Sequence, residues 1–108
     1  MRYLPYDRTV SAMNLYAIGR RDYWGSAEDL QKTAARSAEV GDEMADDVRW
    51  IRTYAVHEES GKLGTVCIYE GTSAEKVREQ AERTGMPADE VSQVLDTVII
   101  RPDPVKAA

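Results

Sequence analysis

One cysteine and one histidine are the residues of this chain best suited to bind a metal. Cys67 lies within an apolar run, and His57 is followed by two glutamates. Thiolate and imidazole both bind transition metals such as nickel, so these two residues are the predicted metal ligands. A cysteine and a histidine without a third orienting group are a weak basis for hydrolysis. The competing interpretation makes Cys67 a small buried residue and His57 a solvated histidine near a hairpin end.

A glutamine on an apolar helix face is the sharpest candidate for binding an organic ligand. Gln80 shares the sheet-facing side of a predicted helix with Val77, Ala81 and Thr84. A buried amide without partners costs about 1–3 kcal/mol, so it needs a partner. Either water or backbone satisfies this amide at an edge position, or Gln80 orients a small ligand in a cleft between helix and sheet.

Three strand residues complete the predicted ligand-binding set. Tyr54 and Tyr69 each combine an apolar ring with a hydroxyl, so packing and binding are compatible roles for them. The guanidinium of Arg52 is suited to a carboxylate ligand, although an arginine on an alternating strand is more often a rim residue. No residue is assigned a catalytic role.

The elements that position these residues follow the order β-α-β-β-α-β. Strands are predicted at 13–20, 48–58, 63–71 and 94–101. The turn at 59–62 contains a glycine, so the second and third strands form an antiparallel hairpin. Residues 22–25 are predicted to be a loop that carries Trp24.

Both predicted helices carry recognisable end signals. The first begins after Ser26, whose hydroxyl is suited to cap it, and stops by Asp46. The second begins at a capping box that spans 72–75, and it ends at Gly85 and Pro87. Small and apolar residues recur at helical spacing along the first helix, so we expect this face to pack closely on a sheet. They are Leu30, Ala34, Ser37, Gly41 and Met44.

This order is the split βαβ arrangement of ferredoxin-like α+β sandwiches, with two helices on one face of a four-stranded antiparallel sheet. Alternation along the second strand predicts two faces. One face carries Trp50, Tyr54 and Val56, and the opposite face carries Ile51, Ala55 and His57. Both faces of that strand therefore carry apolar groups, and neither looks fully solvated. The simplest solution is a homodimer that packs sheet against sheet through an isologous interface.

Composition limits the classes of function. A chain of 108 residues suggests one domain, here 13–101, between a flexible lead-in at 1–12 and a tail at 102–108. A net charge of −5 makes nucleic acid an unsuitable partner, and no apolar run approaches a membrane span. A lone cysteine and the lack of an apolar signal core favour the reducing cytoplasm.

Four motifs together carry a family resemblance: WIRTY at 50–54, VCIYE at 66–70, REQA at 78–81 and GMPADEV at 85–91. They resemble a family of small bacterial proteins catalogued as a domain of unknown function, one member of which is described as nickel-binding and nickel-responsive. The resemblance covers roughly residues 13–98. It implies a ferredoxin-like fold, a homodimer and a bound metal, either nickel or another divalent transition metal.

The chain departs from that family at two positions. Many members carry histidine where this chain has Gln80, and some carry it where this chain has Arg52. His57 is the only histidine here, so one subunit alone cannot build a histidine-rich nickel site.

Three functions therefore compete at this stage. The first is a small cytoplasmic dimeric binding protein for a nickel-like metal ion or a small ligand, and we adopt it. The alternative is a small ferredoxin-like enzyme of the monooxygenase, cyclase or isomerase type, acting on an apolar or aromatic metabolite, which is an analogy from fold alone. The third is an interaction protein. Bound metal would favour the first function. An enclosed apolar pocket lined by the polar groups of Arg52, Tyr54, Gln80 and Cys67 would favour the second, and a filled core without a cavity the third.

Overall fold

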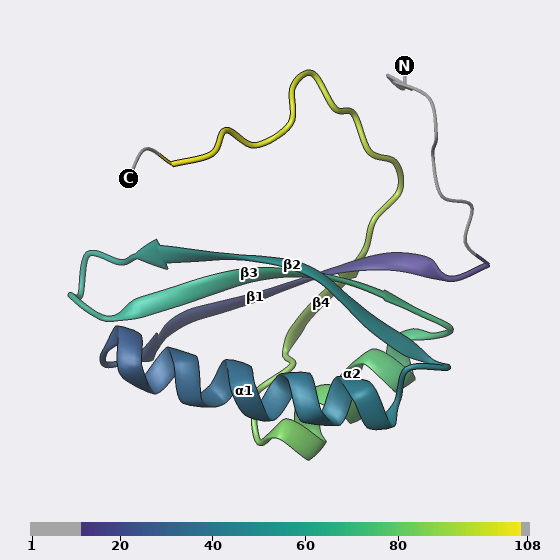
Figure 1. Cartoon of the computed structure of the whole chain (residues 1–108), viewed down its shortest axis with the longest axis horizontal. Coiled ribbons are helices and arrows are strands. Elements are labelled where there is room, and N and C mark those ends of the chain that lie inside the picture. Colours follow the sequence, from purple (N-terminus) through teal and green to yellow (C-terminus); the bar gives the residue numbers. More distant parts are fainter. Residues whose placement is uncertain (1–11, 107–108) are drawn as a thin grey trace.

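The computed structural model describes residues 12–106, and these form a ferredoxin-like α+β sandwich (Figure 1). Its elements are β1 (Asn14–Trp24), α1 (Ala27–Glu43), β2 (Val48–His57), β3 (Leu63–Gly71), α2 (Ala74–Thr84) and β4 (Glu90–Gln93). The four strands form one antiparallel sheet in the order β2-β3-β1-β4. Both helices lie against one face of this sheet, and the C-terminal segment crosses the other side. The predicted fold is confirmed.

Local sequence signals explain most element boundaries. The hydroxyl of Ser26 accepts from the amide of Asp29, as expected for the cap of α1. Gly61 has φ 89° in the β2–β3 turn, and Gly85 has φ 86° at the end of α2. The amide of the next residue, Met86, returns to a carbonyl of the last helical turn, which closes the helix with the expected left-handed cap.

The cap of α2 lies one residue later than predicted. Ser73 is the capping residue, and its hydroxyl accepts from the amide of Lys76 at 3.2 Å. Thr72 instead donates its backbone amide and its hydroxyl to Asp47, at 2.9 and 3.1 Å. Thr72 is therefore held by the segment that precedes β2, and it is not free to cap the helix.

The last strand was predicted at the wrong place. Residues 94–101 have a strand-like composition, but β4 is the preceding segment Glu90–Gln93. Val91 pairs with Ile18 and packs against the core, so the core-facing position is already taken there. The amide of Val94 donates to the carbonyl of Leu15 at 2.9 Å, and the chain then leaves the sheet.

The loop predicted at 22–25 is also wrong, because β1 continues to Trp24. The register between β1 and β3 shifts between Arg20 and Trp24. Asp22 within this irregular stretch has φ 51°, a left-handed conformation that aspartate tolerates better than most residues. The irregularity carries Trp24, which is 4% exposed, to the helix-covered side of the molecule.

A bulge in β2 overturns the predicted alternation of that strand. Trp50 pairs with Tyr69, but Arg52 pairs with the next residue, Ile68, so Ile51 is the extra residue. Side chains beyond the bulge change face. Trp50 therefore lies on the helix-covered side, whereas Tyr54 lies on the open side.

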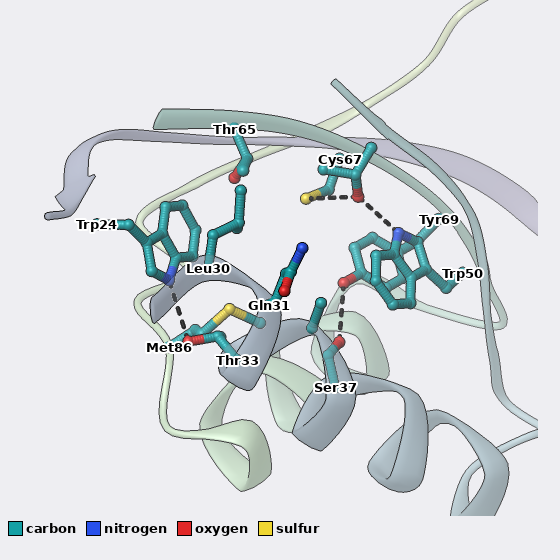
Figure 2. Close-up of a pocket in the computed structure, with 12 residues that line it drawn as sticks. Trp24, Leu30, Gln31, Thr33, Ser37, Trp50, Thr65, Cys67, Tyr69 and Met86 are labelled. Atoms are coloured by element: carbon teal, nitrogen blue, oxygen red, sulfur yellow. Dashed lines mark hydrogen bonds between the residues drawn. The ribbon is translucent and has the colours of Figure 1, made fainter. Parts of the chain in front are cut away.

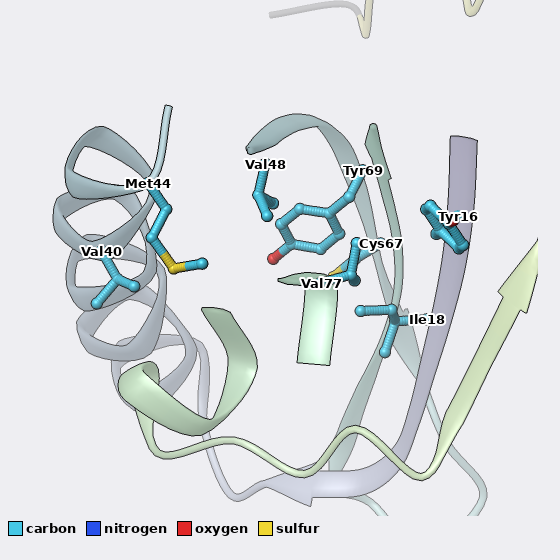
Figure 3. Packing of buried hydrophobic residues seen from close by; sticks show 8 residues of the cluster. All are labelled: Tyr16, Ile18, Val40, Met44, Val48, Cys67, Tyr69 and Val77. Carbon is cyan, nitrogen blue, oxygen red and sulfur yellow. The ribbon is translucent and has the colours of Figure 1, made fainter. Parts of the chain in front are cut away.

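The core lies between the helices and the sheet, toward the C-terminal end of α1 (Figure 3). Its buried members are Tyr16, Ile18, Val40, Met44, Val48, Cys67, Tyr69 and Val77. Gly71 lets α2 approach β3 closely here, since a Cβ at this position would lie 2.6 Å from a methyl of Val77.

Of the predicted domain limits, the lead-in at 1–12 falls outside the described residues except for Ala12, and the tail is described only to Lys106. Within residues 12–106, no helix has the length and apolar character needed to cross a membrane.

Candidate functional site

A cavity of about 240 Å³ lies between the N-terminal half of α1 and the sheet (Figure 2). Helix α1 forms one wall, strands β2 and β3 form the opposite wall, and Trp24 and Met86 close one end. The lining residues are Trp24, Leu30, Gln31, Thr33, Ala34, Ser37, Trp50, Thr53, Thr65, Cys67, Tyr69 and Met86.

The hollow exists because small side chains face one another across the interface. Ala34 and Ser37 line the cavity from α1, and Thr53, Thr65 and Cys67 line it from the sheet. None of these side chains is large, so together they leave part of the space between the helix and the sheet unfilled. The close packing predicted for the small face of α1 is therefore wrong along this half of the helix.

Two tryptophans hold the ends of the cavity. Trp24 donates its indole N–H to the hydroxyl of Thr33 at 3.0 Å, and Trp50 donates its own to Thr53 at 2.7 Å. Trp50 is 36% exposed and stacks on Tyr69, with ring centroids 6.3 Å apart. Both indoles are thus fixed by hydrogen bonds to residues that line the same cavity, and Trp50 forms its solvent-exposed edge.

The surface of the cavity is almost entirely apolar, although several polar side chains of the sheet lie at its edge. The thiol sulfur of Cys67 accepts from the hydroxyl of Thr53 at 3.2 Å and from Nη1 of Arg20 at 3.5 Å. The hydroxyl of Tyr69 lies 3.4 Å from that of Ser37, which links the sheet to α1. Burial raises the pKa of Tyr69 above its ordinary value, so this hydroxyl stays neutral at neutral pH.

Of the four predicted ligand-binding residues, only Tyr69 lines this cavity. Arg52 and Tyr54 lie on the open side of the sheet, where both contact Asp103 of the C-terminal segment. The Tyr54 hydroxyl donates to that carboxylate at 2.6 Å. This contact bounds a second, wider cleft of about 1010 Å³ between the segment and the sheet.

Gln80 is fully buried, and it bridges the two helices. Its amide nitrogen donates to the carbonyl and the hydroxyl of Ser37, at 3.1 and 2.9 Å, and lies 3.4 Å from the hydroxyl of Thr84. Its amide oxygen has no partner among the described residues. Gln80 therefore reaches the cavity only through Ser37, and not by lining a cleft between α2 and the sheet.

The predicted metal ligands are not brought together. Cys67 pairs with Thr53, whereas His57 pairs with Leu63 at the far end of the hairpin. Four residues along a strand correspond to about 13 Å, which is too far for two ligands of one ion. Within residues 12–106, no group of three His, Cys, Asp or Glu side chains is arranged to hold a metal. A nickel site within the described part of one chain does not fit these residues.

Sequence reasoning missed three residues around the cavity: Trp24, Arg20 and Thr65. Arg20 follows Tyr16 and Ile18 at alternate positions of β1, so strand periodicity already placed a charged residue on the buried face. This alternation was the sequence signal that could have identified Arg20. The burial of Trp24 depends on the irregular register of β1, for which we see no local sequence signal.

Comparisons with known proteins agree with this architecture. The crystal structure of SCO4226 from Streptomyces coelicolor A3(2) is similar to this chain, with a TM-score of 0.65 and 26% sequence identity. The similarity covers 78% of this chain and 99% of that one. No significant match is found among curated proteins. A family model described as "Nickel responsive protein SCO4226-like" matches residues 16–94, most of the described part. The chain therefore belongs to the SCO4226-like family of nickel-responsive proteins.

Proposed function

We propose that this protein is a binding protein that holds a small organic molecule in the cavity between α1 and the sheet. The observation that supports this most directly is the cavity itself, with an apolar surface, a tryptophan at each end and polar side chains of the sheet beside it. Sites for small molecules are typically apolar hollows with a few placed polar groups. An apolar cavity of about 150 Å³ accepts benzene, so the volume here suits a molecule of one or two rings.

The energetics of packing support the same proposal. Protein interiors are close-packed, and each unfilled volume costs dispersion contacts. The chain nevertheless keeps Ala34 and Ser37 opposite Thr65 and Cys67, where larger apolar residues would fill the space. A bound molecule with an apolar body restores those contacts, which gives the hollow a role.

Native mass spectrometry of the untagged protein, with and without one- and two-ring aromatic compounds, tests this proposal. We expect one compound to be retained per chain. The variant Ala34→Leu, which extends a side chain into the cavity, should retain none. Retention of no compound by the natural chain, or equal retention by the variant, would contradict the proposal.

The family description favours a second candidate, a nickel-binding role. Because Cys67 and His57 lie far apart in one chain, such a site needs ligands from another copy or from outside residues 12–106. Adding nickel, copper and zinc in the same experiment tests it. Stoichiometric nickel that is lost in His57→Ala would support the second candidate, and a protein that stays empty with every metal would discard it. The enzyme alternative stays a prediction, since no catalytic residue is assigned.

We also propose that the chain forms a homodimer through the open face of the sheet. Tyr54, Val56 and Val66 are each at least 37% exposed there. The C-terminal segment lies over part of the same face, where it lines the wide cleft with Ile51 and Ile68. The interface would therefore include this segment. We expect light scattering to give a dimer for the natural chain and a monomer for Val66→Glu, and a natural chain that runs as a monomer would refute the dimer.

A further inference from the structure

A buried arginine beside the cavity lacks an anionic partner in the part of the chain that the structure describes. Arg20 is 4% exposed, and its side chain carries a cationic guanidinium. Its Nε donates to the carbonyl of Pro87 at 2.8 Å and its Nη1 contacts Cys67, but its Nη2 has no partner among the described residues. No ion pair within 4.0 Å joins Arg20 to a carboxylate of residues 12–106. An unpaired buried cation is costly, so this site favours an anion.

A second unsatisfied polar atom lies next to this arginine. Thr65 is 2% exposed, and its hydroxyl has no partner among the described residues. Arg20 and Thr65 are directly paired across β1 and β3, which places their Cβ atoms about 5 Å apart on the same side of the sheet. Thr65 lines the cavity, and so does Cys67, which Arg20 contacts. Arg20 itself lies behind this lining, so two adjacent donors without acceptors among residues 12–106 are buried directly beneath the apolar surface of the cavity.

We propose that the ligand of this cavity carries an acidic group, such as a carboxylate, which binds Arg20 and Thr65. This inference rests on the proposed function and names the chemical class of its ligand. An oxyanion at this wall would balance the charge of the guanidinium, accept a hydrogen bond from Nη2, and accept a second one from the Thr65 hydroxyl. The apolar body of the molecule then lies between Trp24, Trp50 and the face of α1.

The charge of the whole chain does not supply this preference. The net charge is −5, so long-range attraction favours cations over anions. Preference for an acid must come from the local cation, whose interaction with an anion is strengthened because Arg20 is buried. We therefore predict that the preference for an acidic ligand is lost when the guanidinium of Arg20 is removed.

Titration calorimetry with matched probe pairs tests the inference. Each pair is an aromatic carboxylate and its neutral primary amide, from benzoate and benzamide to naphthoate and naphthamide. We expect the natural chain to bind the acid of a pair roughly tenfold more tightly than the amide. Arg20→Met should abolish this preference, because it weakens binding of the acid much more than binding of the amide. Thr65→Val should reduce it, and Arg21→Met, an exposed neighbour on the same strand, should preserve it.

The outcomes separate the two proposals. If the natural chain binds acids and amides equally, or if Arg20→Met keeps the preference, the acidic-ligand inference is overturned while cavity binding stands. If the natural chain binds no member of any pair, cavity binding fails, and the inference fails with it. If Arg20→Met does not fold, the ratio of acid to amide affinity in the natural chain and in Thr65→Val decides the matter.

Discussion

The two ends of helix α1 meet the same sheet in different ways. At the C-terminal end, Val40 and Met44 pack against Val48, Tyr69 and Val77, and all five are buried. At the N-terminal end, Ala34 and its neighbours stand over the cavity. The Ser37–Tyr69 contact marks the boundary between what we call the filled end and the hollow end.

The difference shows that the sizes of the side chains that face one another decide whether the interface between helix and sheet is fully packed. In the filled end, a long or branched residue of the helix faces a branched or aromatic residue of the sheet. In the hollow end, small residues face small residues, and two hydrogen-bonded tryptophans stand at the ends. The filled end stabilises the fold, and the hollow end is available for a ligand.

The largest expected effect comes from truncating the filled end. Met44→Ala should lower the free energy of unfolding by about 2–5 kcal/mol, because it opens a new cavity in a packed core. Leu30→Ala should cost clearly less, since Leu30 is half-buried and already borders a hollow. Chemical denaturation measures both variants. Equal losses would contradict the distinction between the two ends.

Enlarging a small residue should have opposite consequences at two positions. Ala34→Leu fills existing space, so we expect the free energy of unfolding to stay equal or rise by about 1 kcal/mol. Ala81 is fully buried and does not line the cavity. Ala81→Leu should therefore lower the free energy of unfolding by about 1–3 kcal/mol through overpacking. If Ala34→Leu lowered the free energy of unfolding as much as Ala81→Leu does, the result would contradict the presence of a cavity beside Ala34.

The bridge between the helices supplies a sharper test of what Gln80 does. Gln80→Leu removes its hydrogen bonds to Ser37 and should cost about 1–3 kcal/mol in thermal or chemical unfolding. Because Gln80 does not line the cavity, ligand affinity measured by calorimetry should change little. Loss of binding without loss of stability would instead support the cleft hypothesis drawn from the sequence.

The smallest expected effect is on pH dependence. Burial raises the pKa of Tyr69 above its ordinary value of 10.0 in the folded chain, so the unfolded chain loses this proton first. The contribution of protonated Tyr69 to folding stability is fully present below the pKa that this residue has in the unfolded chain. It is lost as the pH rises through the pKa of Tyr69 in the folded chain. Denaturation at about pH 8 and about pH 11 should show a smaller alkaline loss for Tyr69→Phe than for the natural chain. Identical losses would show that Tyr69 does not contribute.

The sequence was sufficient for the fold and insufficient for the site. Local signals such as the Ser26 cap, the glycine turn at Gly61 and the left-handed Gly85 place the hairpin and both helices. The bulge at Ile51 and the irregular end of β1 are set by pairing with β3, which is non-local. These two features decide that both tryptophans face α1, so the cavity could not be predicted from periodicity.

The C-terminal region shows the same limit. The run at 97–100 has the composition of a strand, but the short connection after Pro87 brings Val91 into register with β1 first. Composition alone does not say which of two successive apolar segments pairs with the sheet.

The central claim is that the hollow end of α1 is a ligand site, and the indole N–H signals of Trp24 and Trp50 test it most directly. The chain has two tryptophans, and both line the cavity. Proton–nitrogen NMR spectra recorded during titration with naphthoate should show both indole signals shifting, while the amides of Val40 and Met44 in the filled end stay in place. Unchanged indole signals, or shifts confined to the open face around Val66, would contradict the account.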